Sequence, residues 1–191
     1  MGCFLSRSGA AASAEPTSAA TTAAPSLQSA LTYGRGDEVE RALAAGGDAN
    51  AEVFGSSPLV FVLRRSKDKM GDYDKKGRGV KVATALLAAR AEVNAKGAGG
   101  MQETALHLAC FNGQAEFVEL LLSKGADPNS TNNQGWTALH TAAVQGSERI
   151  VSLLLHGPIA PDLSAKNVML ETAADAASSE AVRGLIEAAA R

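Results

Sequence analysis

Apolar residues along the middle of the chain recur at a spacing that predicts pairs of short helices. The stretch ALHLACFN, which begins at Ala105, is typical of one short helix that ends at Gly113. From Ala115 to about Lys124 the apolar residues fall on one helical face, which predicts a second helix. Gly125 suits the left-handed turn that often ends a helix. One such pair cannot cover its own apolar face, so we expect it to stack on neighbouring pairs.

This pattern returns after 33 residues, where WTALHTAAVQGSERIVSLLL follows ETALHLACFNGQAEFVELLL. Five pairs of identical residues keep this spacing, namely Thr104 and Thr137, Leu106 and Leu139, His107 and His140, Gly113 and Gly146, and Leu121 and Leu154. The two threonines suit helix N-caps, because a hydroxyl oxygen can accept a hydrogen bond from a free backbone N–H.

A weaker copy lies upstream of this pair. SSPLVFVL (56–63) predicts a first helix with Ser57 as its cap and Pro58 at the tolerated first position. VATALLAARAEVNA (82–95) predicts the second helix, with Arg90 where a glycine is expected. Compared with the central units, about twelve extra residues separate these two helices.

Two further copies lie at the ends of the repeated region. SLQSALTYGRGDEVERALAAGGDANA (26–51) aligns without gaps, and its Arg-Gly-Asp falls at an inter-helix turn. The last copy, VMLETAADAASSEAVRGLIEAAAR, has a shortened helical hairpin and matches the repeat at Leu170, Ala173, Ala174, Val182, Leu185 and Ile186. The chain therefore has about five units, of which the atypical outer two are expected to act as caps.

These residues resemble the ankyrin repeat, whose pattern includes a Thr-Pro-Leu-His start and a Gly-Ala-Asp-x-Asn ending. Residues 103–155 match closely, although Ala105 and Ala138 replace the family's proline. The resemblance implies an all-α solenoid of paired antiparallel helices with β-turn fingers over residues 25–191. It also implies that His107 and His140 satisfy hydrogen bonds of the turns.

Composition narrows the function classes. The chain is 46% hydrophobic and 20% charged with a formal net charge of -2, which argues against a strongly cationic nucleic-acid binder. No stretch approaches the roughly 18 apolar residues of a membrane-spanning helix. Its two cysteines, Cys3 and Cys110, lie far apart and indicate no disulfide framework.

Catalytic and metal-binding patterns are missing from the sequence. His107 and His140 have no accompanying cysteine or carboxylate ligand, and Cys110 has no partner residues at an informative spacing. Neither a phosphate-binding glycine loop nor a hydrolase motif occurs. We therefore expect a monomeric non-enzymatic protein with no cofactor and no metal, which binds a protein partner and no nucleic acid.

The candidate binding residues come from the repeat geometry, because ankyrin proteins usually bind through the fingers and the concave ends of the inner helices. These places hold Met101, Phe111, Asn112, Asn133, Gln134, Trp136, Val144 and Gln145. Tryptophan is enriched at binding hot spots. Two structural alternatives stay open: Phe111 packs on the neighbouring unit, and Trp136 staples its own hairpin.

The insertion near residues 64–79 is basic, with seven basic and three acidic residues for a net charge of +4. Its basic residues are Arg64, Arg65, Lys67, Lys69, Lys75, Lys76 and Arg78. A solvated loop is one interpretation. Contact with anionic lipid is the other, and it gains weight only if the chain is held at a membrane.

Residues 1–24 are mostly Ala, Ser, Thr and Pro, which is typical of a disordered tether. Gly2 and Ser6 fit the N-myristoylation pattern, and Cys3 resembles the palmitoylated cysteine of dually acylated proteins. Two lipid chains are what stable anchoring requires. A transit peptide and an unmodified tail remain as alternatives.

Three functions follow from these observations. The first is an ankyrin-repeat adaptor or scaffold, lipid-anchored through Gly2 and Cys3 on the cytoplasmic face of a membrane. The second is a soluble ankyrin-type inhibitor or regulatory subunit of the cytosol, or of an organelle reached through a transit peptide. The third is an enzyme with a small-molecule site, for which the sequence offers no residues.

Overall fold

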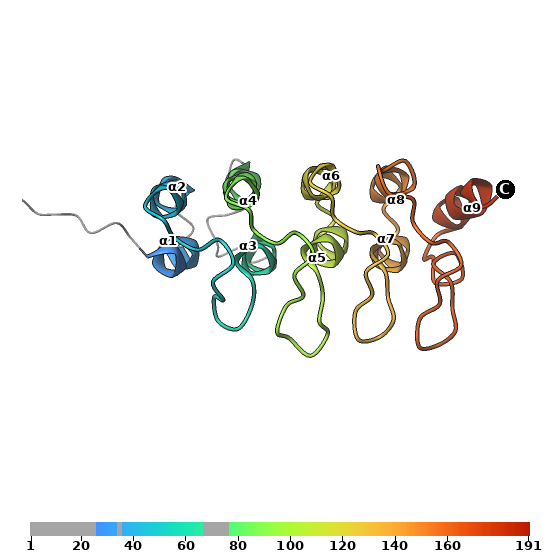
Figure 1. Ribbon diagram of the computed structural model, residues 1–191. Helices are drawn as coiled ribbons and strands as arrows, with labels where there is room; N and C mark the ends of the chain where they lie inside the picture. Colours follow the sequence, from blue (N-terminus) through green and yellow to red (C-terminus); the bar gives the residue numbers. More distant parts are fainter. Residues whose placement is uncertain (1–25, 34–35, 67–76) are drawn as a thin grey trace, which may run out of the picture.

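The computed structural model describes residues 26–33, 36–66 and 77–191, and in this part of the chain there are nine α-helices and no strand. The helices lie in two rows with loops extending from one side (Figure 1). The inner row consists of α1 (Leu27–Tyr33), α3 (Pro58–Ser66), α5 (Ala105–Phe111) and α7 (Ala138–Gln145). The outer row consists of α2 (Gly36–Ala44), α4 (Arg78–Ala88), α6 (Ala115–Ser123), α8 (Glu148–Leu155) and α9 (Glu180–Ala189). The predicted all-α solenoid is confirmed.

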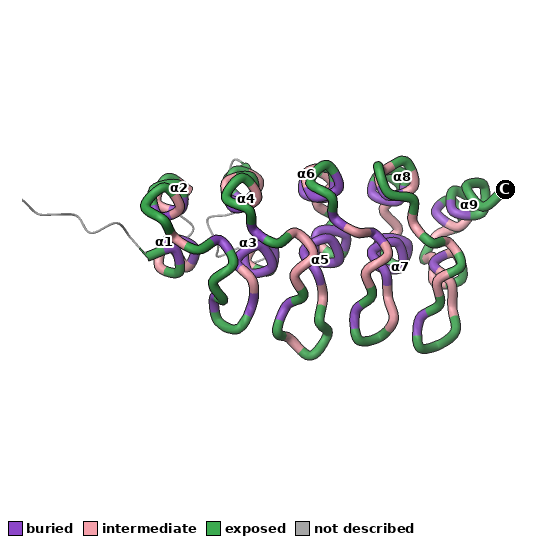
Figure 2. The backbone as a smooth tube through the Cα atoms, viewed as in Figure 1, coloured by how far each residue is buried: buried purple, intermediate pink, exposed green. Residues whose placement is uncertain are grey.

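The core lies between the two rows and along the inner row. Figure 2 shows α5 and α7 buried almost throughout, whereas the outer row exposes the face turned away from the inner row. Leu121 and Leu154, which the repeat alignment pairs, are both fully buried. Burying a leucine side chain stabilises a fold by about 1.5–3 kcal/mol. Stacking is therefore stabilising, because it buries apolar side chains that a single unit would leave exposed.

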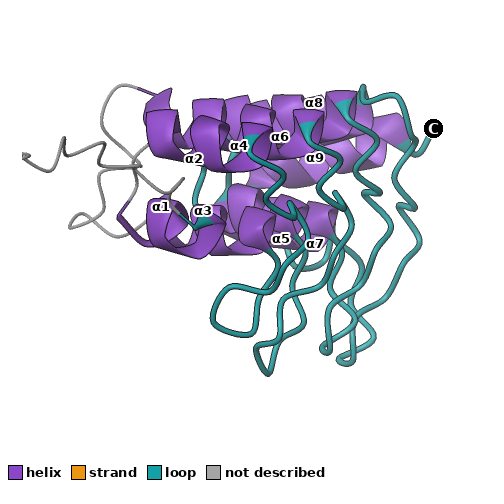
Figure 3. Ribbon diagram, turned by 60° about the vertical axis from the view of Figure 1, so that its left-hand side comes forward, coloured by secondary structure: helices purple, strands orange, loops and turns teal. Residues whose placement is uncertain are grey.

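Loops join each outer helix to the next unit, and we call them fingers 1 to 4 (residues 45–57, 89–104, 124–137 and 156–171). They project together from the inner row (Figure 3). In finger 3 the Gly135 N–H donates to the Asn132 carbonyl at 3.0 Å, and in finger 4 the Leu170 N–H donates to the Asn167 carbonyl at 2.9 Å. Both hydrogen bonds join residues three positions apart, which is the pattern of the predicted β-turns.

Each central inner helix begins at a threonine that is paired with a histidine three residues later. The Thr104 hydroxyl lies 2.8 Å from His107 Nδ1, and the Thr137 hydroxyl lies 2.8 Å from His140 Nδ1. The backbone N–H of each threonine also points at the same ring nitrogen. The predicted threonine caps are confirmed, and the histidine completes a reciprocal capping box.

The fingers are tied to one another by asparagines that the repeat pattern places at equivalent positions. Asn94 Oδ1 accepts a hydrogen bond from the Asp127 N–H at 2.9 Å, and Asn129 Oδ1 accepts one from the Asp162 N–H at 2.6 Å. Asn50 makes the same contact with the Glu92 N–H at 2.7 Å. Each of these asparagines also donates to a carbonyl of the next finger. This asparagine ladder fixes the spacing of successive units.

Two predictions around the insertion need correction. The second helix of unit 2 begins at Arg78 rather than at residue 82, and the first helix continues to Ser66. Arg64 and Arg65 therefore belong to α3, and Arg78 belongs to α4. α4 begins earlier than predicted because Val80, which packs partly buried against the core, extends its apolar face toward the insertion. Lys67, Lys69, Lys75 and Lys76 lie outside the described residues, as do Gly2 and Cys3.

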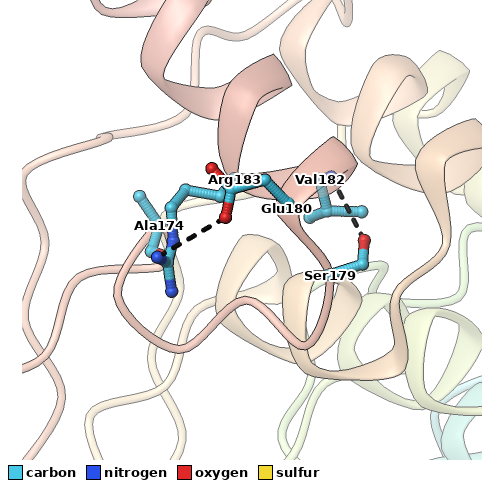
Figure 4. A network of polar contacts seen from close by, with 5 residues as sticks. All are labelled: Ala174, Ser179, Glu180, Val182 and Arg183. Atoms are coloured by element: carbon cyan, nitrogen blue, oxygen red, sulfur yellow. Dashed lines mark hydrogen bonds and ion pairs between the residues drawn. The ribbon is translucent and has the colours of Figure 1, made fainter.

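The last unit departs from the paired-helix pattern. Its shortened hairpin has a single turn, in which the Ala176 N–H donates to the Thr172 carbonyl at 3.0 Å, and then α9. The Ser179 hydroxyl caps α9 by accepting from the Val182 N–H at 3.2 Å. Arg183 Nε then donates to the Ala174 carbonyl at 3.3 Å, which holds α9 against the turn (Figure 4).

Candidate partner-binding surface

Six of the eight predicted binding residues line one cavity of about 240 Å³, which we call the finger pocket. It lies where fingers 2 and 3 meet the ends of α5 and α7. Its lining consists of Met101, Glu103, Phe111, Asn132, Gln134, Trp136, Thr141, Val144 and Gln145. Drug-sized ligands usually occupy cavities of about 300–1,000 Å³, so this cavity suits one side chain better than a whole small molecule.

The wall of the finger pocket is apolar and open to solvent. Phe111 is 43% exposed and Met101 is 40% exposed, although both are large apolar side chains. Phe111 lies at the last position of α5, and Val144 lies one residue before the end of α7, so the repeat places both at one edge of the inner row. Exposing large apolar side chains to water is unfavourable, and a partner that covered them would remove this cost.

Trp136 belongs both to the pocket wall and to the junction between units. Its carbonyl accepts a hydrogen bond from His107 Nε2 of the preceding unit at 2.9 Å, while its half-buried ring lies 6.3 Å from the His140 ring. Trp136 therefore ties the turn to the preceding unit through its backbone, and it also lines the pocket.

Glu103 is the one acidic or basic side chain in the pocket lining. It is half-buried, and within the described residues its carboxylate has no hydrogen bond and no ion pair. The indole N–H of Trp136 likewise has no acceptor among the residues that the structure describes. The pocket thus combines apolar walls with an unpaired carboxylate and an unpaired donor.

Two predicted binding residues lie outside the pocket. Asn112 caps α5, and its amide donates to the Leu63 carbonyl at 3.0 Å, so its side chain is committed to the preceding unit. Asn133 is exposed at the tip of finger 3, where its N–H donates to the Met101 carbonyl at 3.0 Å and its amide donates to the Gly100 carbonyl. Asn112 was predicted to face a partner because the repeat places it at the exposed concave end of an inner helix.

Exposed apolar residues on fingers 1 and 4 were not predicted as binding residues. Phe54 lies on finger 1 and stacks on Phe61 with ring centroids 5.8 Å apart. At the tip of finger 4, Val168, Met169 and Leu170 are 68%, 73% and 74% exposed. Leu170 was matched to a repeat position instead. Three successive apolar residues just before a threonine cap, at a turn, were the signal that could have revealed this surface.

The histidines and the buried cysteine serve the fold. Burial lowers the pKa of His107 and of His140, so both rings are neutral in the folded protein. A neutral ring with Nε2 donating to a carbonyl leaves Nδ1 as an acceptor for the threonine. Burial raises the pKa of the Cys110 thiol. Within the described ranges, no three His, Cys, Asp or Glu side chains gather as a metal site requires.

The described helices also bear on membrane insertion and on lipid contact. None of those within residues 26–33, 36–66 and 77–191 is long and apolar enough to cross a bilayer. Of the basic residues of the insertion, Arg64, Arg65 and Arg78 fall in this part. Arg64 donates to the Ser56 hydroxyl of finger 1 at 3.5 Å, and the Arg65 guanidinium lies 5.8 Å from the Phe61 ring centre.

Comparison with known proteins agrees with the geometry of the units. A family model described as "Ankyrin repeats (3 copies)" matches residues 75–167 and 106–191, which together cover more than half of the 191 residues. No curated protein matches the chain. Proteins built from this repeat generally act as interaction modules without enzymatic activity. With its capped inner helices, its fingers and this match, the chain belongs to the ankyrin-repeat family.

Proposed function

We propose that this chain is an adaptor or scaffold that docks a protein partner on the finger pocket and the finger tips. The observation that carries the proposal is the distribution of exposed apolar side chains. Of the ten large exposed ones among the described residues, nine lie on the fingers or at the ends of the inner helices. These are Tyr33, Phe54, Met101, Phe111, Val144, Ile159, Val168, Met169 and Leu170. Apolar side chains gathered on one face favour docking of a partner.

Truncation of Phe111 tests the docking surface. We expect Phe111→Ala to weaken partner binding by about 2 kcal/mol, or roughly 30-fold, because a hot-spot aromatic ring is lost. Leu185→Ala is the matched control, because Leu185 is 38% exposed but lies on α9 in the outer row. Partner recovery is compared between the variants by quantitative pull-down from the native host. Equal loss in both variants, or loss in neither, contradicts the proposed surface.

We further propose that the solenoid is held at the cytoplasmic face of a membrane by acylation of Gly2 and Cys3. The pattern Met-Gly-Cys-x-x-Ser supports this, because Gly2 and Cys3 supply the two attachment points that stable anchoring requires. Translation must then begin at Met1. Basic residues of the insertion would add attraction to anionic lipid at about 1 kcal/mol for each well-placed charge.

Intact mass of the native protein and its distribution between membrane and cytosol test the anchor. We expect Gly2→Ala to move the protein to the cytosol, and Cys3→Ser to leave a weakly bound form, since one myristoyl chain binds only marginally. Ser8→Ala, which lies in the same leader outside the pattern, serves as the control. If Gly2→Ala partitions as the wild type does, the second candidate applies: a soluble inhibitor or regulatory subunit with an inert leader or a transit peptide.

A further inference from the structure

The finger pocket poses a solvation problem that limits what can fill it. Its apolar walls favour a side chain that excludes water, yet Glu103 presents a carboxylate with no partner within the described residues. An aliphatic occupant would strip water from that carboxylate and put no donor in its place. Leaving a charged group without water or a partner costs more than a neutral one, so a purely apolar occupant is disfavoured.

A cation that also stacks on aromatic rings resolves the problem. The Trp136 and Phe111 rings both line the cavity, and tryptophan is the best aromatic partner for a cation. The guanidinium of arginine is planar and weakly hydrated, stacks on aromatic faces, and pairs with a carboxylate through two parallel hydrogen bonds. An ammonium group is more strongly hydrated and lacks the flat face, so lysine fits these walls less well.

We infer that the finger pocket receives an arginine side chain of the partner protein, with its guanidinium between the aromatic rings and the Glu103 carboxylate. This inference rests on the proposed docking function and names the chemistry of the partner at that surface. Further donors and acceptors flank the same cavity, namely the Gln134 and Gln145 amides and the Trp136 indole N–H. These groups can form hydrogen bonds with the polar groups of the partner segment beside the arginine.

The volume and the charge of the pocket both match this occupant. A cavity of about 240 Å³ is below the usual size for a small-molecule ligand and accommodates one long side chain. Glu103 contributes the only formal charge of the lining, so the pocket carries a charge of -1 and a guanidinium neutralises it. The recognised segment is therefore one that presents an exposed arginine.

The test uses the purified full-length chain and a library of random 12-residue peptides displayed on phage. Selected peptides are synthesised in two forms, one with arginine and one with citrulline, which keeps the shape and loses the charge. Trp136 is the only tryptophan of the chain, so its fluorescence reports directly on occupancy of the pocket. We expect selection of peptides that share an arginine, and a binding loss of at least 10-fold on replacement by citrulline.

Glu103→Gln gives the matched protein variant, because it removes the charge and keeps the shape. We expect it to weaken the arginine peptide about 5-fold and to reduce the citrulline penalty, as coupling between the two groups requires. Glu119→Gln, on the exposed face of α6, should leave both affinities unchanged. Phe111→Leu should weaken binding about 3-fold, since it removes one aromatic face and keeps an apolar side chain.

The outcomes separate this inference from the proposed function. If selected peptides anchor through leucine, phenylalanine or lysine, or if citrulline binds as well as arginine, the arginine inference is wrong. Docking at this surface then still stands, provided that those peptides change Trp136 fluorescence and respond to Phe111→Ala. If the selected peptides do neither, or if no peptide is selected, the proposed docking surface is wrong and the arginine inference fails with it.

Discussion

At the residue scale, Arg90 occupies a backbone position that its neighbours in the repeat assign to glycine. Its φ is 66°, whereas Gly46 and Gly125 at the equivalent helix ends have φ of 92° and 83°. In each case the following N–H donates back to the last turn of the helix, as Ala91 does to Leu86 at 2.9 Å. The left-handed region favours glycine, so the arginine side chain adds strain that the turn does not need.

We therefore predict that Arg90→Gly stabilises the protein by about 0.5–1 kcal/mol. Relief of strain exceeds the greater entropy that glycine has in the unfolded chain. The hydrogen bond from Asn50 to residue 90 survives, because it ends on the backbone carbonyl. Chemical denaturation measures the change. Ala89→Gly, where φ is −81°, should destabilise instead, and a gain in stability there would contradict the explanation.

The two capping histidines make stability depend on pH. Their folded-state pKa values lie below the usual 6.5, because burial disfavours the charged ring. The unfolded chain therefore binds more protons as pH falls below 6.5, and the folded state loses stability by up to about 1.4 kcal/mol per pH unit for each ring. Their contribution is fully present above pH 6.5.

Urea unfolding between pH 7.5 and 5 tests this dependence, and we expect a lower midpoint at pH 5. His156→Gln serves as a control, because His156 is exposed at the end of α8 and caps no inner helix. His107→Gln should destabilise at pH 7.5 and flatten the slope. A slope that His107→Gln leaves intact would contradict the assignment.

At the scale of elements, fingers 3 and 4 have the same turn and different tips. Gly135 and Leu170 occupy equivalent places with φ of 71° and 65°. Leu170 is 74% exposed, so burial does not compensate for its unfavourable backbone conformation. A bulky apolar residue in a strained and exposed position is expected where function requires the side chain.

We predict that Leu170→Gly raises stability by about 0.5–1 kcal/mol and weakens partner binding about 10-fold. The first change follows from relief of strain, and the second from the loss of apolar contact area. Thermal unfolding of the free protein and a binding titration measure the two effects separately. Gly135→Ala is the opposite control and should destabilise, because its Cβ would lie 3.2 Å from the Asn167 Cα. If Leu170→Gly binds the partner normally, finger 4 is no part of the surface.

The elements also divide into those that the sequence predicts and those that need the structure. The two central units (residues 103–155) are predicted by their helical periodicity and by the period of 33 residues, including the Thr104 and Thr137 caps. The start of α4 does not, because RGVK reads as polar insertion rather than as a helical turn. Two further details need the structure, because a residue's place in the repeat does not give them: the Asn112 side chain is committed to the Leu63 carbonyl, and the Leu170 side chain faces water.

At the scale of the whole molecule, stability passes from unit to unit through contacts between neighbours. The asparagine ladder joins finger 1 to 2, 2 to 3 and 3 to 4, with Asn50, Asn94 and Asn129 as its steps. From α2 onward, helices also contact the neighbouring members of their own row. Each unit thus depends on its neighbours, which is the behaviour of a one-dimensional repeat protein.

We predict that removing one asparagine of the ladder destabilises only the end of the solenoid that lies nearer to it. Asn129→Ala removes two hydrogen bonds to finger 4, each worth about 1 kcal/mol, so amide exchange should rise in α9 and not in α3. Asn50→Ala should raise exchange in α1 and α2 and leave α9 protected. Hydrogen–deuterium exchange with peptide-level resolution measures both. A uniform rise along the whole solenoid would contradict nearest-neighbour coupling.

The bonds from the capping histidines end on main-chain oxygens, and every amino acid supplies one. His107 reaches the carbonyl of Trp136, and His140 reaches the carbonyl of Glu171, although one of these side chains is an indole and the other a carboxylate. These hydrogen bonds therefore do not depend on the side chain of the residue that accepts them. Mutations can change the side chains of one finger while the hydrogen bonds between units remain. The binding specificity of this chain can therefore change without a change of fold.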